Sequence, residues 1–222
     1  MKKILLIEDR SQRQKLFENE TGIKLKDYEN ILENKIEEEY RLFVSLLQSG
    51  DFDFTPYQVI ISHKSAFGDD NILLLDKLKQ YCKSSQKILV LFSGGLSSSY
   101  YDDNEFIHIE LNSKLFYSQN LELFLQSAEQ SQEHIMMLSY GKYWKVNILL
   151  NVLEKINYFI NINQEEDILY EEFSNEVELS RLNQLNLNQY QPKIDGNWID
   201  LEEIFKLRDN IKSIINIAVL DE

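Results

Sequence analysis

Polar residues of types that could carry chemistry follow the apolar runs in the first half of the chain. Carboxylates such as Glu8 and Asp9 supply the oxygen ligands that Mg²⁺ prefers. His63 has a side chain that titrates near neutral pH, so it could act as a general base or accept a phosphoryl group. A serine with two glycines after a strand could hold a phosphate on backbone amides. The candidate residues are Glu8, Asp9, Ser62, His63, Ser93, Gly94, Gly95 and Lys114.

The spacing of apolar residues indicates the elements that must position these side chains. Short continuous apolar runs predict buried strands, and apolar residues at three- and four-residue intervals predict helices. The predicted strands are 3–7, 57–62, 87–92 and 106–111, and the predicted helices are 10–20, 28–48, 71–82 and 118–128. This alternation predicts an α/β fold with a doubly wound parallel sheet of the flavodoxin type. Ligands in such sheets lie beyond the carboxyl ends of the strands, where the candidate residues are found.

The order of these motifs resembles the receiver domain of two-component response regulators over about residues 1–130. ILLIEDR is similar to the family's first strand with its acidic pair, VLFSG to the strand that ends in a hydroxyl residue, and LNSKLF to the strand end that carries a lysine. The resemblance implies that Glu8 and Asp9 bind Mg²⁺. It also implies that Ser93 contacts a phosphoryl group and that Lys114 pairs with it.

The residue that receives the phosphoryl group in the receiver family is missing. Ser62 stands where the family has an aspartate, and Leu115 stands where a proline usually follows the lysine. The resemblance therefore implies a pseudo-receiver, a signalling or protein–protein interaction module without Asp phosphorylation, and favours a non-enzymatic role. We expect no catalytic residue, and the one candidate cofactor is a weakly bound Mg²⁺ ion. Whether His63, Asp69 or Asp70 replaces the acceptor stays open, although GDDN is typical of a turn and a helix N-cap.

The stretch LVLFSGGLSSS (89–99) supports an alternative function, because it resembles the SGGxDS motif of the PP-loop ATP pyrophosphatases. That resemblance implies phosphate binding by Ser93, Gly94, Gly95 and Ser97 in a nucleotide- or phosphate-binding enzyme. Ser97 replaces the motif's aspartate, and YYDDNEF lacks the apolar periodicity of the helix that should follow. The structural explanation for the glycines is a tight turn that tolerates the left-handed conformation.

Residues 131–222 are predicted to form a second region, a helical extension with one further strand in HIMMLSYG. Two helices, 143–160 and 201–218, each carry a narrow apolar seam, which could pack on the other helix or on a second copy of the chain. A homodimer through these helices is one expectation. The stretch 163–198 is rich in Asn, Gln and Glu and is interpreted as a partly ordered connection.

Composition narrows the class of partner. The chain has 23 Lys and Arg against 37 Asp and Glu, a net charge of −14, which disfavours nucleic acid and anionic membranes. The single cysteine, Cys82, cannot form an internal disulfide and is interpreted as a core residue. The N-terminus lacks a signal-peptide core, and no apolar run reaches membrane length. We therefore expect a cytoplasmic protein with a protein partner.

Overall fold

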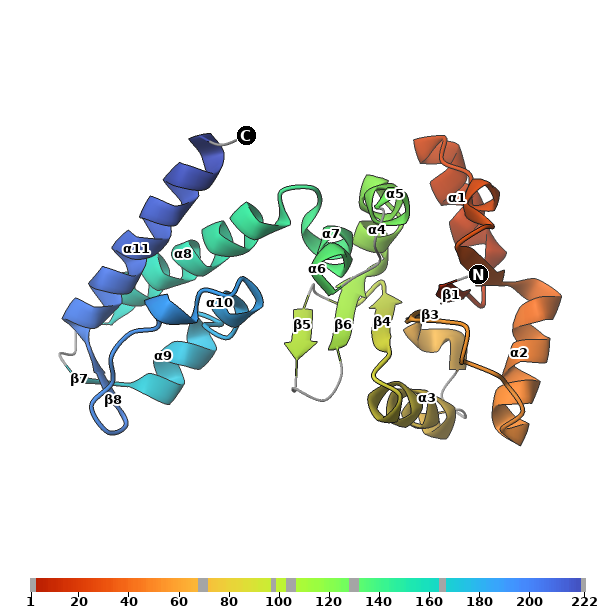
Figure 1. The fold of residues 1–222 in the computed structure, drawn as a ribbon, viewed down its shortest axis with the longest axis horizontal. Coiled ribbons are helices and arrows are strands. Elements are labelled where there is room, and N and C mark those ends of the chain that lie inside the picture. Colours follow the sequence, from red (N-terminus) through yellow and green to blue (C-terminus); the bar gives the residue numbers. More distant parts are fainter. Residues whose placement is uncertain are drawn as a thin grey trace. The chain divides into compact units, whose positions relative to one another are not determined.

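The computed structural model describes residues 3–67, 72–96, 99–102, 107–127, 132–163 and 167–220 (Figure 1). Asp69, Asp70 and Ser97 lie outside these ranges. The chain divides into two compact units, Met1–Lys142 and Tyr143–Glu222. This division falls after residue 142, whereas the sequence placed it after residue 130. Each unit is described by itself.

The described part of the first unit is built on a six-stranded sheet with strand order β2-β1-β3-β4-β6-β5. Its strands are β1 (Ile4–Ile7), β2 (Leu32–Lys35), β3 (Val59–His63), β4 (Ile88–Ser93), β5 (Ser99–Asp102) and β6 (Ile107–Asn112). The first five strands in that order are parallel, and β5 pairs antiparallel with β6 at the edge. The parallel strands thus follow the flavodoxin-like order. The predicted doubly wound α/β fold is confirmed.

Helices cover both faces of this sheet, as a mostly parallel sheet requires. They are α1 (Ser11–Thr21), η1 (Leu25–Tyr28), α2 (Glu37–Ser49), η2 (Lys64–Phe67), α3 (Ile72–Ser84), α4 (Ser113–Phe116), α5 (Gln119–Gln126), α6 (Gln132–Ile135) and α7 (Met137–Tyr140). On one face, Phe43 of α2 and Leu78 of α3 share a core with Leu5, Ile60 and Leu89 of the strands. In the view of Figure 1, α1 and α5 lie above the strands and α3 lies below them.

The predicted helix over 28–48 is wrong in its first part. Residues Leu32–Lys35 form the edge strand β2, and α2 begins only at Glu37. Leu32 and Ile36 are four residues apart, which fits a helix, but Ile36 has extended backbone angles. Because Glu33, Asn34 and Lys35 are polar, β2 shows no apolar run that would reveal it as a strand.

Two further differences concern short segments. Between β4 and β6, Ser99–Asp102 form the antiparallel strand β5, where parallel neighbours usually take a crossover helix. The strand predicted in HIMMLSYG is also wrong, because these residues form the short helices α6 and α7. A short apolar run fits a buried helical turn as well as a strand, so periodicity could not distinguish them.

The second unit packs two long helices and a two-stranded antiparallel sheet around its own apolar core. Its elements are α8 (Trp144–Ile162), β7 (Asp167–Leu169), α9 (Tyr170–Glu176), α10 (Arg181–Gln184), η4 (Asn188–Tyr190), β8 (Trp198–Asp200) and α11 (Leu201–Leu220). Leu149 and Ile156 of α8 share this core with Leu207 and Ile211 of α11, so both predicted seams are buried within one chain.

The stretch interpreted as a connection is part of the same core. Phe173 and Leu182, which lie between the two long helices in the sequence, are fully buried there, and β7 pairs antiparallel with β8. The described part of 163–198 is therefore an ordered part of the second unit's core and not a loose connection. Among the described residues of the whole chain, no helix combines the length and the apolar character needed to cross a membrane.

Candidate functional site

The carboxyl ends of β1 and β3 bring three predicted candidates together. Ile7 pairs with Ser62 in the parallel register, so Glu8 and Asp9 emerge beside the last residue of β3, His63. One possible ligand atom from each of Glu8, Asp9 and His63 lies within 4.8 Å of the others. Together with Arg13 and Tyr117, which contact Glu8, these residues form a set that we call the Glu8 cluster.

Ser62 does not face this cluster, although the sequence placed it at the reactive position. Neighbouring residues of a strand point to opposite faces, and His63 packs edge-on against Phe92, whose ring stacks on Phe116 of α4. Ser62 is fully buried, and its hydroxyl donates to the carbonyl oxygen of His63 at 3.2 Å. The residue that β3 delivers to the acidic pair is therefore His63, a difference of one position.

Arg13 neutralises the acidic pair and was missed in the sequence. Its Nη1 donates to Oε1 of Glu8 at 2.6 Å and to Oδ1 of Asp9 at 3.0 Å. The first turn of α1 folds the guanidinium back over the end of β1, because Arg13 follows Asp9 by four residues. That spacing, at the start of a predicted helix, was the one available signal.

Both oxygens of the Glu8 carboxyl have donors, although its side chain is 0% exposed. The backbone amide of Arg10 donates to Oε1 at 3.1 Å, beside Arg13. The hydroxyl of Tyr117, which follows α4, donates to Oε2 at 2.9 Å. Next to this cluster, the amides of Gln14 and Asn34 exchange two hydrogen bonds. Buried polar groups are tolerated when they are satisfied in this way.

The electrostatics of the cluster leave one negative charge for Arg13 to balance. Burial raises the pKa of Glu8 to about 7, aided by its hydrogen bond with Asp9 and opposed by Tyr117 and Arg13. Burial also acts to raise the pKa of Asp9, but hydrogen bonds with Glu8 and Arg13 outweigh it and lower that pKa. Asp9 therefore carries the charge, and Glu8 holds a proton up to near neutral pH.

His63 is a neutral, structural hydrogen-bond acceptor in this arrangement. Burial, together with the charge of Arg13, lowers its pKa to about 4. Its Nδ1 accepts from the backbone amide of Ser65 at 3.2 Å and lies 2.7 Å from the Ser65 hydroxyl. Asp9 Oδ1 lies 3.5 Å from the same nitrogen. A Ser-His-Asp triad places its serine and carboxylate on opposite ring nitrogens, so these residues do not form one.

The divalent-cation site expected at Glu8 and Asp9 does not fit the residues as arranged. Nη1 of Arg13 is within hydrogen-bond distance of an oxygen of each acid, which is where a bridging cation would sit. A second positive charge beside a guanidinium would be repelled. His63 would also be a nitrogen ligand, whereas Mg²⁺ prefers oxygens.

The glycine loop lacks the features that phosphate binding would need. Gly94 and Gly95 form the predicted tight turn, in which the backbone amide of Leu96 donates to the carbonyl oxygen of Ser93 at 3.3 Å, but neither glycine has a positive φ. A Cβ on Gly94 would meet no atom closer than 3.8 Å, and one on Gly95 would meet none within 4 Å. The next described element along the chain is strand β5, whereas the motif requires a helix directly after the loop. The phosphate-binding alternative gains no support from the described residues.

Ser93 and Lys114 lie at a neighbouring strand end. Ser93 pairs with Asn112 in the register of β4 and β6, and the Asn112 side chain donates to the carbonyl oxygen of Gly94 at 3.0 Å. Lys114 lies two residues beyond Asn112, in α4, and is exposed. Its backbone amide donates to the Asn112 side chain, which caps this helical turn.

No family model, curated protein or solved structure matches the chain. The fold and the cluster themselves define the class: an α/β sheet protein with the flavodoxin-like order of parallel strands, whose strand-end acids are held by an internal arginine.

Proposed function

We propose that the chain is a pseudo-receiver, a non-enzymatic signalling module that binds another protein and is not switched by Asp phosphorylation. The observation that carries this proposal is the position of Arg13 between Glu8 and Asp9. In the receiver family an acidic pair binds Mg²⁺ and an aspartate on the third strand takes the phosphoryl group. Here a guanidinium holds the acids, and β3 supplies His63 to the cluster.

The charges at the Glu8 cluster explain why such a module would not switch between a phosphorylated and an unphosphorylated state. The phosphorylation switch adds negative charge to a site that a metal has neutralised. In this chain the neutralising charge is covalently attached, and His63 is neutral with its Nδ1 already accepting a hydrogen bond. The site therefore offers no unpaired positive charge that could bind a phosphoryl group.

The net charge and the second unit bear on the partner. A charge of −14 favours a basic protein surface over nucleic acid. The apolar seams of 143–160 and 201–218 are buried against each other within one chain, so a homodimer would need other surfaces. A cytoplasmic location belongs to this proposal, because signalling receivers act there.

The test is phosphoryl transfer from acetyl phosphate with Mg²⁺, followed by intact-mass spectrometry. We expect no mass increase for the native protein. The double variant His63→Asp with Arg13→Ala, which supplies a carboxylate and removes the internal cation, is the matched control and should acquire Mg²⁺-dependent phosphorylation. Stable phosphorylation of the native protein would overturn the proposal, and treatment with alkali would distinguish phosphohistidine, which survives it, from an acyl phosphate, which is hydrolysed.

A further inference from the structure

The two-stranded sheet of the second unit, β7 with β8, has one face in the core and one apolar face outside it. Ile168 and Ile199 pair across β7 and β8 and are 3% and 1% exposed. The next pair, Leu169 with Trp198, points the other way and is 44% and 48% exposed. Strand alternation places the two pairs on opposite faces. The outer face is therefore a surface that this unit's own core does not use.

A third apolar side chain joins this surface. Ile194 is 49% exposed and lines, with Trp198, a surface hollow of about 500 Å³. The turn that separates them is closed by two backbone hydrogen bonds between Asp195 and Trp198. We call Leu169, Ile194 and Trp198 the Trp198 patch. A half-exposed tryptophan beside two half-exposed aliphatic residues is typical of a protein-binding surface, because such aromatic anchors dominate interface energies.

Acidic residues surround the patch. Asp195, Asp200 and Glu203 line the same hollow, with Lys193 as its one lysine among the described lining residues. Glu203 accepts from Lys206 and from the backbone of Lys193, so its charge is engaged.

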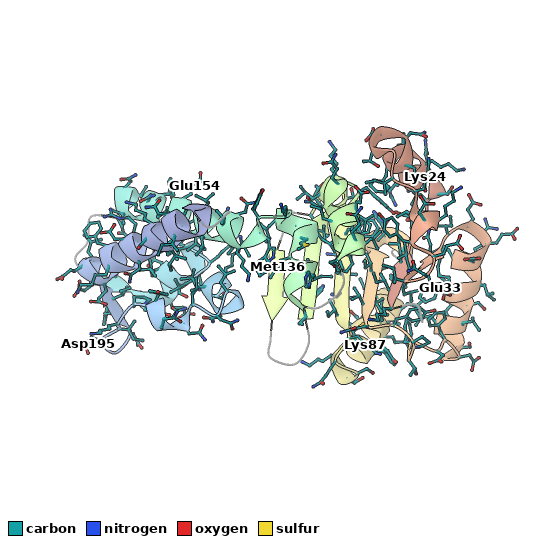
Figure 2. The ribbon with its side chains drawn as sticks, turned by 45° about the horizontal axis from the view of Figure 1, so that its top comes forward. Lys24, Glu33, Lys87, Met136, Glu154 and Asp195 are labelled. Atoms are coloured by element: carbon teal, nitrogen blue, oxygen red, sulfur yellow. The ribbon has the colours of Figure 1, made fainter. Side chains whose placement is uncertain are left out.

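Asp195 lies in the turn before β8, and Figure 2 labels it. From Tyr143 to Glu222 the sequence has seven Lys and Arg against fifteen Asp and Glu. Charge complementarity therefore favours a basic partner segment.

We propose that the Trp198 patch docks a segment of a partner protein in which an Arg or Lys stands next to a large apolar residue. The apolar side chain fills the hollow beside Ile194, and the cation lies over the indole of Trp198 and reaches Asp195. This inference rests on the proposed interaction role and adds the chemistry of the partner.

Fluorescence anisotropy with the full-length protein and labelled synthetic peptides tests the patch. The probes are an eight-residue peptide of alternating Leu and Arg, a Leu and Glu peptide, and a Ser and Arg peptide. We expect saturable binding of the Leu and Arg peptide, weakened at least tenfold by Trp198→Ser. Asp195→Lys should weaken that peptide and improve the Leu and Glu peptide. The matched control is Leu16→Ser, at a 53% exposed leucine of the first unit, which should change nothing.

Three results would overturn the docking proposal: no saturable binding of the Leu and Arg peptide, equal binding by Trp198→Ser, or equal binding of the Ser and Arg peptide. Far-UV circular dichroism verifies that Trp198→Ser is folded. Because the acetyl phosphate test reads the first unit, phosphorylation of the native protein would defeat the pseudo-receiver proposal while leaving the peptide result interpretable. Absence of peptide binding together with absence of phosphorylation would contradict the docking proposal and leave the pseudo-receiver proposal standing.

Discussion

The two units of the molecule differ in whether their cores contain polar and charged side chains. Among the described residues, the buried polar or charged side chains are Glu8, Gln14, Ser62 and His63, all in the first unit. The core cluster of the second unit consists of apolar side chains, and its ion pairs lie outside that cluster, from the exposed pair of Lys206 with Glu202 to the partly buried pair of Arg181 with Glu178.

This difference predicts which kind of substitution most lowers the stability of each unit. A buried ionic network contributes little net stability when complete, but removing one partner leaves an uncompensated charge in a low dielectric. An apolar core loses free energy in proportion to the volume removed. The first unit should therefore respond to changes of charge, and the second to changes of size.

The largest effect should follow Arg13→Met, which removes the cation but keeps much of the side-chain volume. We expect a loss of about 3–5 kcal/mol in the free energy of unfolding, because Glu8 and Asp9 lose their common donor. Urea unfolding at pH 7 measures this. The control is Arg10→Met, whose exposed side chain contacts Asp9 only at 3.6 Å and should cost about 0–1 kcal/mol. Equal losses for the two variants would contradict the account.

In the second unit, Ile211→Ala should cost about 2–5 kcal/mol, because this fully buried residue joins α11 to α8. Ile217→Ala, at a 59% exposed position of the same helix, should cost far less. Urea unfolding followed by circular dichroism compares the two. If the exposed position proved as sensitive as the buried one, a further contact would cover that face of α11.

The next effect concerns pH. The folded-state pKa of Glu8 is raised from 4.5 to about 7, so its contribution to stability is full below pH 4.5 and is lost as the pH rises through 7. The pKa of His63 is lowered from 6.5 to about 4, so its contribution is present above pH 6.5 and is lost as the pH falls through 4. The two slopes oppose each other between pH 4.5 and 6.5.

Glu8→Gln should therefore reveal the histidine slope. We expect its stability to fall by up to about 3 kcal/mol on acidification from pH 6.5 to 4, at about 1.4 kcal/mol per unit of pKa difference. The native protein and the exposed-site control Glu20→Gln should show a flatter profile. Urea midpoints at half-unit pH steps give the comparison, and a Glu8→Gln profile parallel to the native one would refute the opposing slopes.

The smallest effect should be at the glycine loop. Gly95→Ala should change stability by less than about 0.5 kcal/mol, because neither φ nor space demands glycine there. Gly50→Ala is the contrasting variant, since Gly50 ends α2 at φ 82° and an alanine there would be strained by about 1 kcal/mol. Thermal unfolding in the presence of ATP also tests the alternative function. A stabilisation by ATP that Gly95→Ala abolishes would revive the nucleotide site.

Much of the fold could be predicted because buried parallel strands are continuous apolar runs. β1, β3 and β4 show such runs, and β6 alternates apolar with polar residues, which is also a strand pattern. β2 and β5 lie at the sheet edges and carry polar residues, so local pattern did not reveal them. The site was predicted at the correct strand ends but one residue off at β3, because a shift of one position moves a side chain to the other face. The contact of Arg13 with the two acids could not be predicted, because it depends on how the start of α1 is placed relative to the end of β1 in the tertiary structure.

The central claim is that Arg13 takes the place of a metal ion at the Glu8 cluster. Isothermal titration calorimetry with Mg²⁺ and Mn²⁺ on the native protein and on Arg13→Met tests it most directly. The account predicts no measurable binding by the native protein at the cluster and a new divalent-cation site in the variant, lost again in Arg13→Met with Asp9→Asn. Binding of Mg²⁺ by the native protein that Asp9→Asn removes would contradict the claim.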